Sequence, residues 1–157
     1  MLTIPALGTN FRNSPMRIVK ILPEGINLAW KSLSPYIDKA LSRGQGEFIS
    51  SDIYSAIERG TMQAWFALDK DEDIKAAMVT EVGDYPRLRV IRIVLLSGRD
   101  LNKYSPLIDE ILTKWAIEIG AGRIETYCRK GFSRVLKRYN AREIYTILAK
   151  DITKHTH

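Results

Sequence analysis

The sequence predicts an α/β protein, or more narrowly an α+β protein with one mixed sheet and flanking helices. Segments with the composition of strands alternate with segments whose apolar residues have helical spacing. Three strand-like segments follow one another across short polar turns, which indicates an antiparallel meander. A later strand, helix and strand in sequence indicate a parallel pair joined by a right-handed crossover.

One strand and two helices are expected before the meander. Residues 16–22 (MRIVKIL) are rich in β-branched residues and end at a proline, as a strand does. Apolar residues over 24–44 then recur every three or four positions, which predicts a helix. Ser34 precedes a proline within it, so we expect the helix to break there and restart with Ser34 as its cap. A shorter helix is expected over 51–59.

The meander and the elements after it account for the rest of the fold. Its strands are separated by the turn DKDED and the turn GDYP. They are predicted over 62–68, 74–82 and 88–96.

A helix over 105–120 is the clearest amphipathic segment in the chain. Ser105 is expected to cap it, with a proline at its first position, after a loop over 97–104. Trp115 lies on its apolar face and should be buried. A strand over 123–128 follows.

The last two predicted elements are a short helix over 131–139 and a strand over 143–150. The domain organisation is then an irregular arm over 1–15, a single domain over 16–150 and a polar tail over 151–157. The length of 157 residues and the 45% hydrophobic content suit one domain with one core.

Composition bears on where the protein is located and on the charge of its partners. No apolar run approaches the ~18 residues of a membrane span, and the N-terminus does not have the pattern of a signal peptide. The one cysteine cannot form an internal disulfide, which favours a cytoplasmic location. The net charge of +6 favours acidic partners, although ordinary solubility charge explains it equally well.

The most distinctive local feature is a basic cluster near the C-terminus, interleaved with Phe132 and Tyr139. It can grip the phosphate of a cofactor or of nucleic acid, or an acidic protein. A solvated helix face is the alternative interpretation. The cluster consists of Arg129, Lys130, Arg134, Lys137 and Arg138.

Element order and local motifs together resemble the GNAT (acyl-CoA N-acyltransferase-like) superfamily, over residues 16–150. The second half also resembles small GNAT-like proteins of phages and prophages. The similar stretches are WFAL at 65–68, AMVTEVGDYP at 77–86, WAIEIG at 115–120 and RKGFSRVLKRYNA at 129–141.

The resemblance implies that acetyl-CoA binds where the third meander strand separates from the parallel strand. Its pyrophosphate then lies at the start of the next helix, where N–H groups and the helix dipole favour an anion. The family pattern there is Arg or Gln, two residues, Gly, any residue, then Gly or Ala. Only its first glycine is present here, and Asp100 adds a negative charge that Arg99 and Lys103 can offset. The implied binding residues are Leu95, Leu96, Gly98, Arg99, Lys103 and Ser105.

Glu81 is the candidate catalytic base. It shares a strand face with Val79, and an apolar neighbour favours a carboxylate that takes a proton from an amine. The alternative is an exposed Glu81 paired with an arginine. The family's proton-donating tyrosine falls on Leu136, so Tyr139 and Tyr127 are the candidate substitutes, or else packing residues. Direct transfer requires no metal.

Three functions follow from these observations. The first is an acyl-CoA-dependent N-acetyltransferase with a degenerate cofactor loop. The second is a non-catalytic GNAT-fold protein that serves as a structural or binding component of a phage or prophage particle. Its protein partner would bind the arm over 1–15, and its location would be the host cytoplasm or the virion. The third is a nucleic-acid-binding module based on the positive charge.

Overall fold

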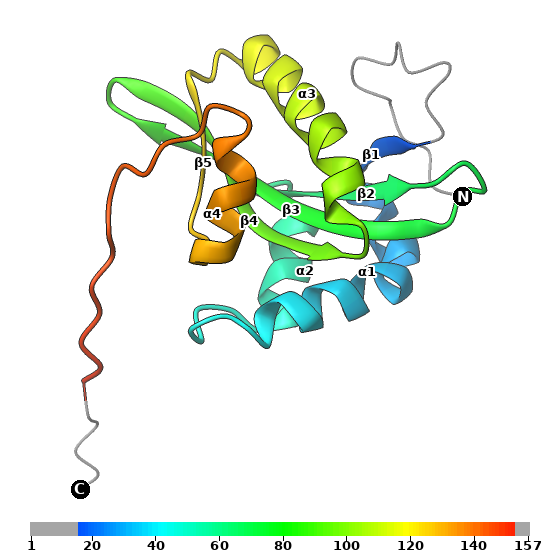
Figure 1. The fold of residues 1–157 in the computed structure, drawn as a ribbon. Coiled ribbons are helices and arrows are strands. Elements are labelled where there is room, and N and C mark those ends of the chain that lie inside the picture. The colour runs from blue at the N-terminus through cyan, green and yellow to red at the C-terminus, as the bar shows by residue number, and fades with distance from the viewer. Residues whose placement is uncertain (1–15, 153–157) are drawn as a thin grey trace, which may run out of the picture. The chain divides into compact units, whose positions relative to one another are not determined.

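Five strands form one sheet in which each strand pairs with the next one in the chain (Figure 1). They are seen in a computed structural model that describes residues 16–152. The first four are antiparallel neighbours, and the last two are parallel, so the predicted mixed sheet is confirmed. The strands are β1 (Arg17–Ile21), β2 (Met62–Leu68), β3 (Ile74–Tyr85), β4 (Leu88–Gly98) and β5 (Arg123–Thr126).

Among the described residues, three of the four α-helices cover this sheet from its two sides (Figure 1). The chain divides after Tyr127 into two units, and the fourth helix belongs to the second. Because the chain divides in this way, the single domain expected over 16–150 stays a prediction. The helices are α1 (Ile26–Leu41), which follows a 3₁₀ turn at Pro23–Gly25, α2 (Ser50–Glu58), α3 (Leu101–Ile119) and α4 (Lys130–Lys137).

The first unit has two hydrophobic clusters, one on each face of the sheet. Successive residues of β2 face opposite sides: Phe66 belongs to the cluster under α1 and α2, and Trp65 to the cluster under α3. Trp115 of α3 is buried and meets Trp65 edge to face, with ring centroids 5.3 Å apart. The predicted burial of Trp115 is confirmed.

The predicted break at Ser34 is wrong, because α1 runs through it without interruption. Pro35 has no N–H group to donate to the carbonyl of Lys31. Because Lys31 is exposed, water can donate a hydrogen bond to that carbonyl instead. Leu33 and Ile37, on either side of the proline, are both buried in the cluster under α1 and α2. Packing of one continuous face therefore outweighs the local signal for a break.

The predicted loop over 97–104 and the helix start at Ser105 are also wrong. β4 extends to Gly98 and α3 begins at Leu101, so only two residues separate them. Ser105 lies inside the helix, where its hydroxyl donates to the carbonyl of Leu101 at 2.6 Å. Tyr104 is buried in the cluster under α3, and this burial explains why the helix begins earlier than its Ser-Pro sequence predicts.

The strand predicted over 143–150 is not formed. Residues 141–152 belong to no helix or strand. Their sequence has β propensity, but a strand forms only where a second strand supplies its hydrogen bonds. The arm over 1–15 and most of the tail over 151–157 lie outside the described residues.

Candidate functional site

β4 separates from β5 halfway along its length. Its pairing with β5 covers only Val90 to Ile93, whereas its pairing with β3 continues to Gly98. At the point of separation Val79 pairs with Leu95 and the next residue of β3 pairs with Ile93, so β4 carries one extra residue, a β-bulge at Val94. Within the first unit, the β4 edge from Val94 to Gly98 therefore has no pairing with β5.

The point of separation is fixed by a side chain. Thr126, at the last pair of β5, donates from its hydroxyl to the carbonyl of Ile93 at 2.9 Å. Beyond it, Leu95 packs against the cluster under α1 and α2, and Leu96 against the cluster under α3. Because their side chains are committed to the core, these two predicted cofactor residues can offer a ligand mainly their backbone groups, as an added strand would use them.

Gly98 ends β4 in a conformation that needs a glycine. Its φ is +155°, and a Cβ there would lie 2.4 Å from the Cβ of Ala76. The next amide, of Arg99, donates to the carbonyl of Lys75 at 2.8 Å, which holds the end of β4 against β3. The close approach of β3 and β4 therefore explains why residue 98 is a glycine, whether or not a phosphate binds beside it.

The N-terminus of α3 follows at once. Asp100 is left-handed, with φ of +55°, and its carbonyl accepts the amide of Lys103 at 2.8 Å. The Asp100 side chain does not cap the helix. A helix start leaves its first amides without intrahelical acceptors, which favours an anion. Arg99 and Lys103 are exposed beside it, whereas the Ser105 hydroxyl is engaged inside the helix.

A charged network lies across three strands at the end where β4 and β5 still pair. Arg92 donates to Glu81 and to Glu125, each at 2.7 Å, and also to the hydroxyl of Tyr85 at 3.2 Å. The Tyr85 hydroxyl in turn donates to Glu125 at 3.2 Å. Only 19% of the Arg92 side chain and 12% of the Glu125 side chain are exposed. Burial opposes the charge of Arg92, but the hydrogen bonds outweigh it and raise the pKa of the guanidinium.

Glu81, the predicted base, is therefore an ion-paired residue. The alternative expectation, pairing with a neighbouring arginine, describes its observed contact. Arg92 lies directly opposite Glu81 in the register of β3 and β4. Protonation of Glu81 would weaken this contact, so any role as a base competes with the pair.

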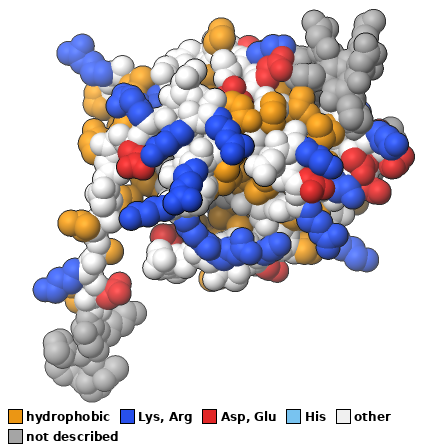
Figure 2. Space-filling view, in the orientation of Figure 1, with side chains coloured by type: hydrophobic (Ala, Val, Ile, Leu, Met, Phe, Trp, Pro, Cys, Tyr) orange, Lys and Arg blue, Asp and Glu red, His pale blue; other side chains and the backbone are white. Residues whose placement is uncertain are grey.

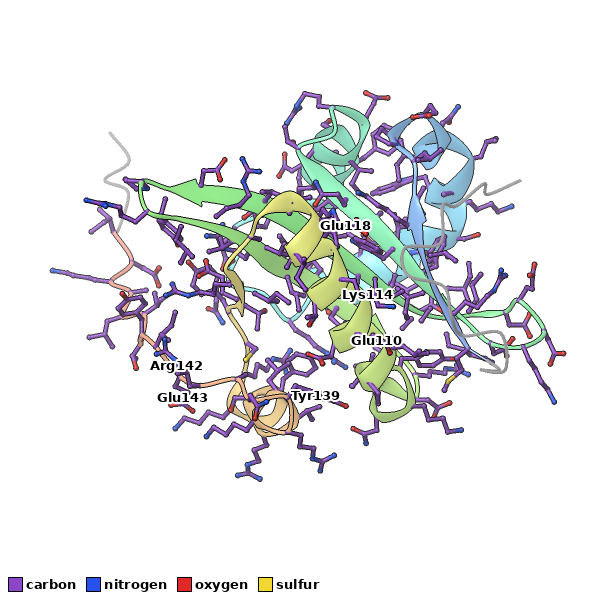
Figure 3. The ribbon with its side chains drawn as sticks, turned by 90° about the horizontal axis from the view of Figure 1, so that it is seen from above. Glu110, Lys114, Glu118, Tyr139, Arg142 and Glu143 are labelled. Atoms are coloured by element: carbon purple, nitrogen blue, oxygen red, sulfur yellow. The ribbon has the colours of Figure 1, made fainter. Side chains whose placement is uncertain are left out.

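The two candidate proton donors lie in different units. Tyr127 directly follows β5 and is largely exposed, and the Arg92 guanidinium lies 5.8 Å from its ring centroid. Tyr139 belongs to the second unit, where its amide donates to the carbonyl of Leu136 just past α4 (Figure 3). Glu81 and Tyr127, which both belong to the first unit, thus lie beside the same residue, Arg92.

Sequence reasoning missed Arg92, Glu125 and Tyr85. A signal was present, because Arg92 interrupts an apolar strand and Glu125 lies in the strand that was expected to be its parallel neighbour. Opposite charges on adjacent strands stabilise each other when they lie in register. The register itself could not be derived.

The basic cluster lies on and around α4 and is exposed throughout (Figure 2). Phe132, Val135 and Leu136 of the same helix are half-buried, so α4 has one apolar and one basic side. Lys137 forms an ion pair with Glu143 at 3.4 Å. The other cluster residues are Arg129, Lys130, Arg134 and Arg138.

No helix within residues 16–152 has the length and hydropathy needed to cross a membrane. No three His, Cys, Asp or Glu residues there are grouped so that they could hold a metal ion.

Known structures share this fold. A ribosomal-protein-alanine N-acetyltransferase from Brucella melitensis biovar Abortus 2308 matches with a TM-score of 0.65 at 12% identity, over 88% of this chain and 99% of its own. A predicted acetyltransferase from Clostridium acetobutylicum, solved with acetyl-CoA, matches with a TM-score of 0.64 at 16% identity, over 90% and 99%. An aminoglycoside acetyltransferase from an uncultured soil metagenomic sample matches with a TM-score of 0.61 at 12% identity, over 88% and 97%.

At such low sequence identity, the likeness to these structures shows a shared fold alone. The GNAT-like fold expected from the sequence is confirmed. No protein-family model and no curated protein matches the sequence.

Proposed function

We propose that the chain is an acyl-CoA-dependent N-acetyltransferase of the GNAT kind, with low catalytic power. The observation that carries the proposal is the free edge of β4, which runs past the end of β5 directly into the N-terminus of α3. An edge of backbone donors and acceptors followed by a helix start suits a ligand with an amide-containing arm and a phosphate group.

The residues at the helix start fit the anionic part of such a ligand. The backbone from Val94 to Gly98 would pair with the amide-containing arm. The amides at the start of α3, with the side chains of Arg99 and Lys103, would bind the pyrophosphate. Asp100 opposes this binding with its negative charge, which predicts modest affinity.

The bound cosubstrate would supply an acetyl thioester. In the transfer, the acceptor nitrogen forms a bond to the acetyl carbon and the carbon–sulfur bond breaks. The nitrogen loses its proton to Glu81, and the leaving sulfur takes a proton from Tyr127, the candidate donor of the same unit. We expect a slow reaction, because Arg92 holds Glu81 in an ion pair and Leu136 stands where the family has its proton donor.

The same two features favour a second candidate function, a GNAT-fold protein that binds without turnover. It includes the structural role in a phage or prophage particle, with a partner at the arm. The basic side of α4 supports the weaker third candidate, nucleic-acid binding through phosphate contacts.

Calorimetric titration with acetyl-CoA and with desulfo-CoA tests the proposal. Arg99→Ala should weaken binding by about 1–3 kcal/mol, the usual loss for a hydrogen bond to a charged group. Arg87→Ala is the control, because Arg87 is an exposed arginine in the turn between β3 and β4. Absence of binding by the native chain would leave the non-catalytic function, and unchanged affinity in Arg99→Ala would remove Arg99 from the site.

A further inference from the structure

Arg92 contacts two carboxylates, and the two contacts are unequal. Its Nε and Nη2 both donate to Oε1 of Glu125, at 3.0 and 2.7 Å, whereas Nη1 alone donates to Glu81, at 2.7 Å. The side chain of Glu125 is 12% exposed and that of Glu81 is 29% exposed, so water screens the contact with Glu125 less. Of the two carboxylates, Glu125 therefore holds the guanidinium more firmly.

Two further groups keep the contact of Arg92 with Glu125 in place. The Tyr85 hydroxyl accepts from Nη2 of Arg92 and donates to Oε1 of Glu125, both at 3.2 Å, so it bridges the pair. The other carboxylate oxygen of Glu125, Oε2, lies 3.8 Å from Nη1 of Arg123. Neither contact involves Glu81, and both can persist when the contact of Arg92 with Glu81 breaks.

Strand register places these groups in one row across the sheet. Arg92 of β4 lies opposite Glu81 of β3 and opposite Glu125 of β5, and side chains in such a row are direct neighbours. On β2 the residue opposite Glu81 is Met62, which carries no charge. Among the described residues, the ionisable groups of this network are Glu81, Tyr85, Arg92, Arg123, Glu125 and, beside the guanidinium, Tyr127.

An ion pair opposes proton uptake by a base, and the second carboxylate reduces this opposition. When Glu81 takes a proton, its attraction for Arg92 falls. A largely buried guanidinium without another carboxylate would then be left unpaired, at a high cost in free energy. Here two hydrogen bonds to Glu125 remain, so protonation of Glu81 gives up only one hydrogen bond of the guanidinium.

We propose that Glu125 is a positioning residue for the acyl transfer, because it anchors Arg92 and so allows Glu81 to take and release a proton. The inference rests on the proposed function, in which Glu81 is the base. The proton passes from the acceptor nitrogen to Glu81 and then to water, while Arg92 stays with Glu125. Glu125 itself touches no reacting atom.

Nuclear magnetic resonance of the arginine side chains tests the anchoring whether or not the chain is active. The Nε–H signal of Arg92 is the one that Arg92→Lys lacks, and its hydrogen exchange with water should be slow in the native chain. Glu125→Gln should speed this exchange by roughly tenfold, because a neutral amide is a weaker acceptor than a carboxylate. Glu81→Gln should leave it nearly unchanged, because Glu81 accepts from Nη1. Equal effects of the two variants, or a larger effect of Glu81→Gln, would overturn the anchoring.

Steady-state acetylation kinetics test the consequence for the base. In Glu125→Gln only one of the two carboxylates, Glu81, is left to pair with Arg92, and a neighbouring negative charge is lost. Both changes favour the ionised form of Glu81, so the acidic limb of the kcat profile should move to lower pH by about one pH unit. The value of kcat should fall by about tenfold, a part of the ~10²–10⁴-fold that a general base contributes. The KM for acetyl-CoA should not change, because the β4 edge from Val94 to Gly98 is unaltered.

Asp84→Asn is the matched control for the kinetics. It removes another carboxylate of the sheet that pairs with an arginine, Arg89, and it should leave kcat and the acidic limb as they are in the native chain. A native chain that acetylates no amine would contradict the proposed function, and the exchange measurement would still decide whether Glu125 anchors Arg92. An active native chain whose Glu125→Gln variant keeps the native rate and pH profile would contradict this inference alone.

Discussion

Arg92 is the residue on which the candidate catalytic groups converge. It contacts Glu81, Glu125 and Tyr85 by hydrogen bonds, and its guanidinium lies near the Tyr127 ring. Arg123 also forms an ion pair with Glu125 at 3.8 Å, so two cations balance the two carboxylates of this network. Glu81 can therefore act in two ways, as a structural partner of Arg92 and as the base of the proposed reaction.

Glu81→Gln separates these two effects, because glutamine keeps the shape of the side chain and cannot act as the base. If Glu81 takes the proton, acetylation across a broad panel of amines should fall by about 10²–10⁴-fold, the usual contribution of general base catalysis. Asp84→Asn is the control, since Asp84 is also on β3 and is also paired with an arginine, Arg89. An unchanged rate and pH profile in Glu81→Gln would show that another group is the base.

Lys20 predicts a pH dependence of stability. Burial lowers the pKa of Lys20 below its usual 10.5, and Glu118 of α3 (Figure 3) partly opposes this. Below the folded-state pKa the ammonium is charged in both states, so the folded chain bears the whole cost of burying it. Between the folded and unfolded pKa values the unfolded chain binds more protons, so stability rises with pH.

The variant Lys20→Met should therefore gain most over the native chain at neutral pH, and its advantage should shrink as the pH approaches 10.5. Urea unfolding at pH 7 and pH 10, followed by tryptophan fluorescence, measures this difference. Lys39→Met removes an exposed lysine of α1 and should show no such change. An advantage that grows with pH would mean that the cation–π contacts of Lys20 with Trp65 and Trp115 dominate its energetics.

At the scale of elements, the short connection from β4 to α3 determines the geometry of the candidate site. Gly98→Ala would place a Cβ 2.4 Å from the Cβ of Ala76 and 2.5 Å from the carbonyl of Lys75. We expect a loss of about 2–3 kcal/mol in unfolding free energy, as for an overpacked position, and weaker binding of acetyl-CoA.

Gly60→Ala is the matched control, because Gly60 has a positive φ of +78° but open space where the Cβ would be. Its cost should be about 1 kcal/mol, from the left-handed backbone alone. Chemical denaturation of both variants measures the two losses. Equal losses would show that β3 and β4 move apart easily and that close approach is not the reason for Gly98.

Much of the fold follows from periodicity, and the failures have a common cause. The strand predicted over 62–68 has the observed bounds of β2, and the parallel pairing of β4 with β5 follows from the strand, helix and strand order. The helix starts expected at Ser34 and Ser105 failed, because cap and proline signals are local and weaker than the burial of Leu33 and Tyr104.

The candidate site was predicted only in part for a related reason. Glu81 and Tyr127 were selected as single residues, yet their shared partner Arg92 is brought to them by strand register. A bulge at Val94 sets which residues of β4 lie opposite β3 beyond that point, and no local pattern in the sequence marks it. The missing strand over 143–150 is likewise a question of partners, which propensity alone cannot answer.

At the scale of the whole molecule, the stability of the described chain resides in its first unit. Every buried residue among residues 16–152 lies between Ile18 and Ala116, and Trp30, Trp65 and Trp115 all belong to that unit. The second unit contributes no buried residue to either hydrophobic cluster. It does contribute α4 and the basic residues on and around that helix.

A chain that ends at Tyr127 should therefore fold and unfold cooperatively, with the tryptophan fluorescence of the full chain. Its unfolding midpoint in urea should lie close to that of the full chain, because no residue of the second unit belongs to either hydrophobic cluster. Urea unfolding of both chains, followed by tryptophan fluorescence, measures the two midpoints. Failure of the shorter chain to unfold cooperatively, or a much lower midpoint, would show that its core needs the second unit.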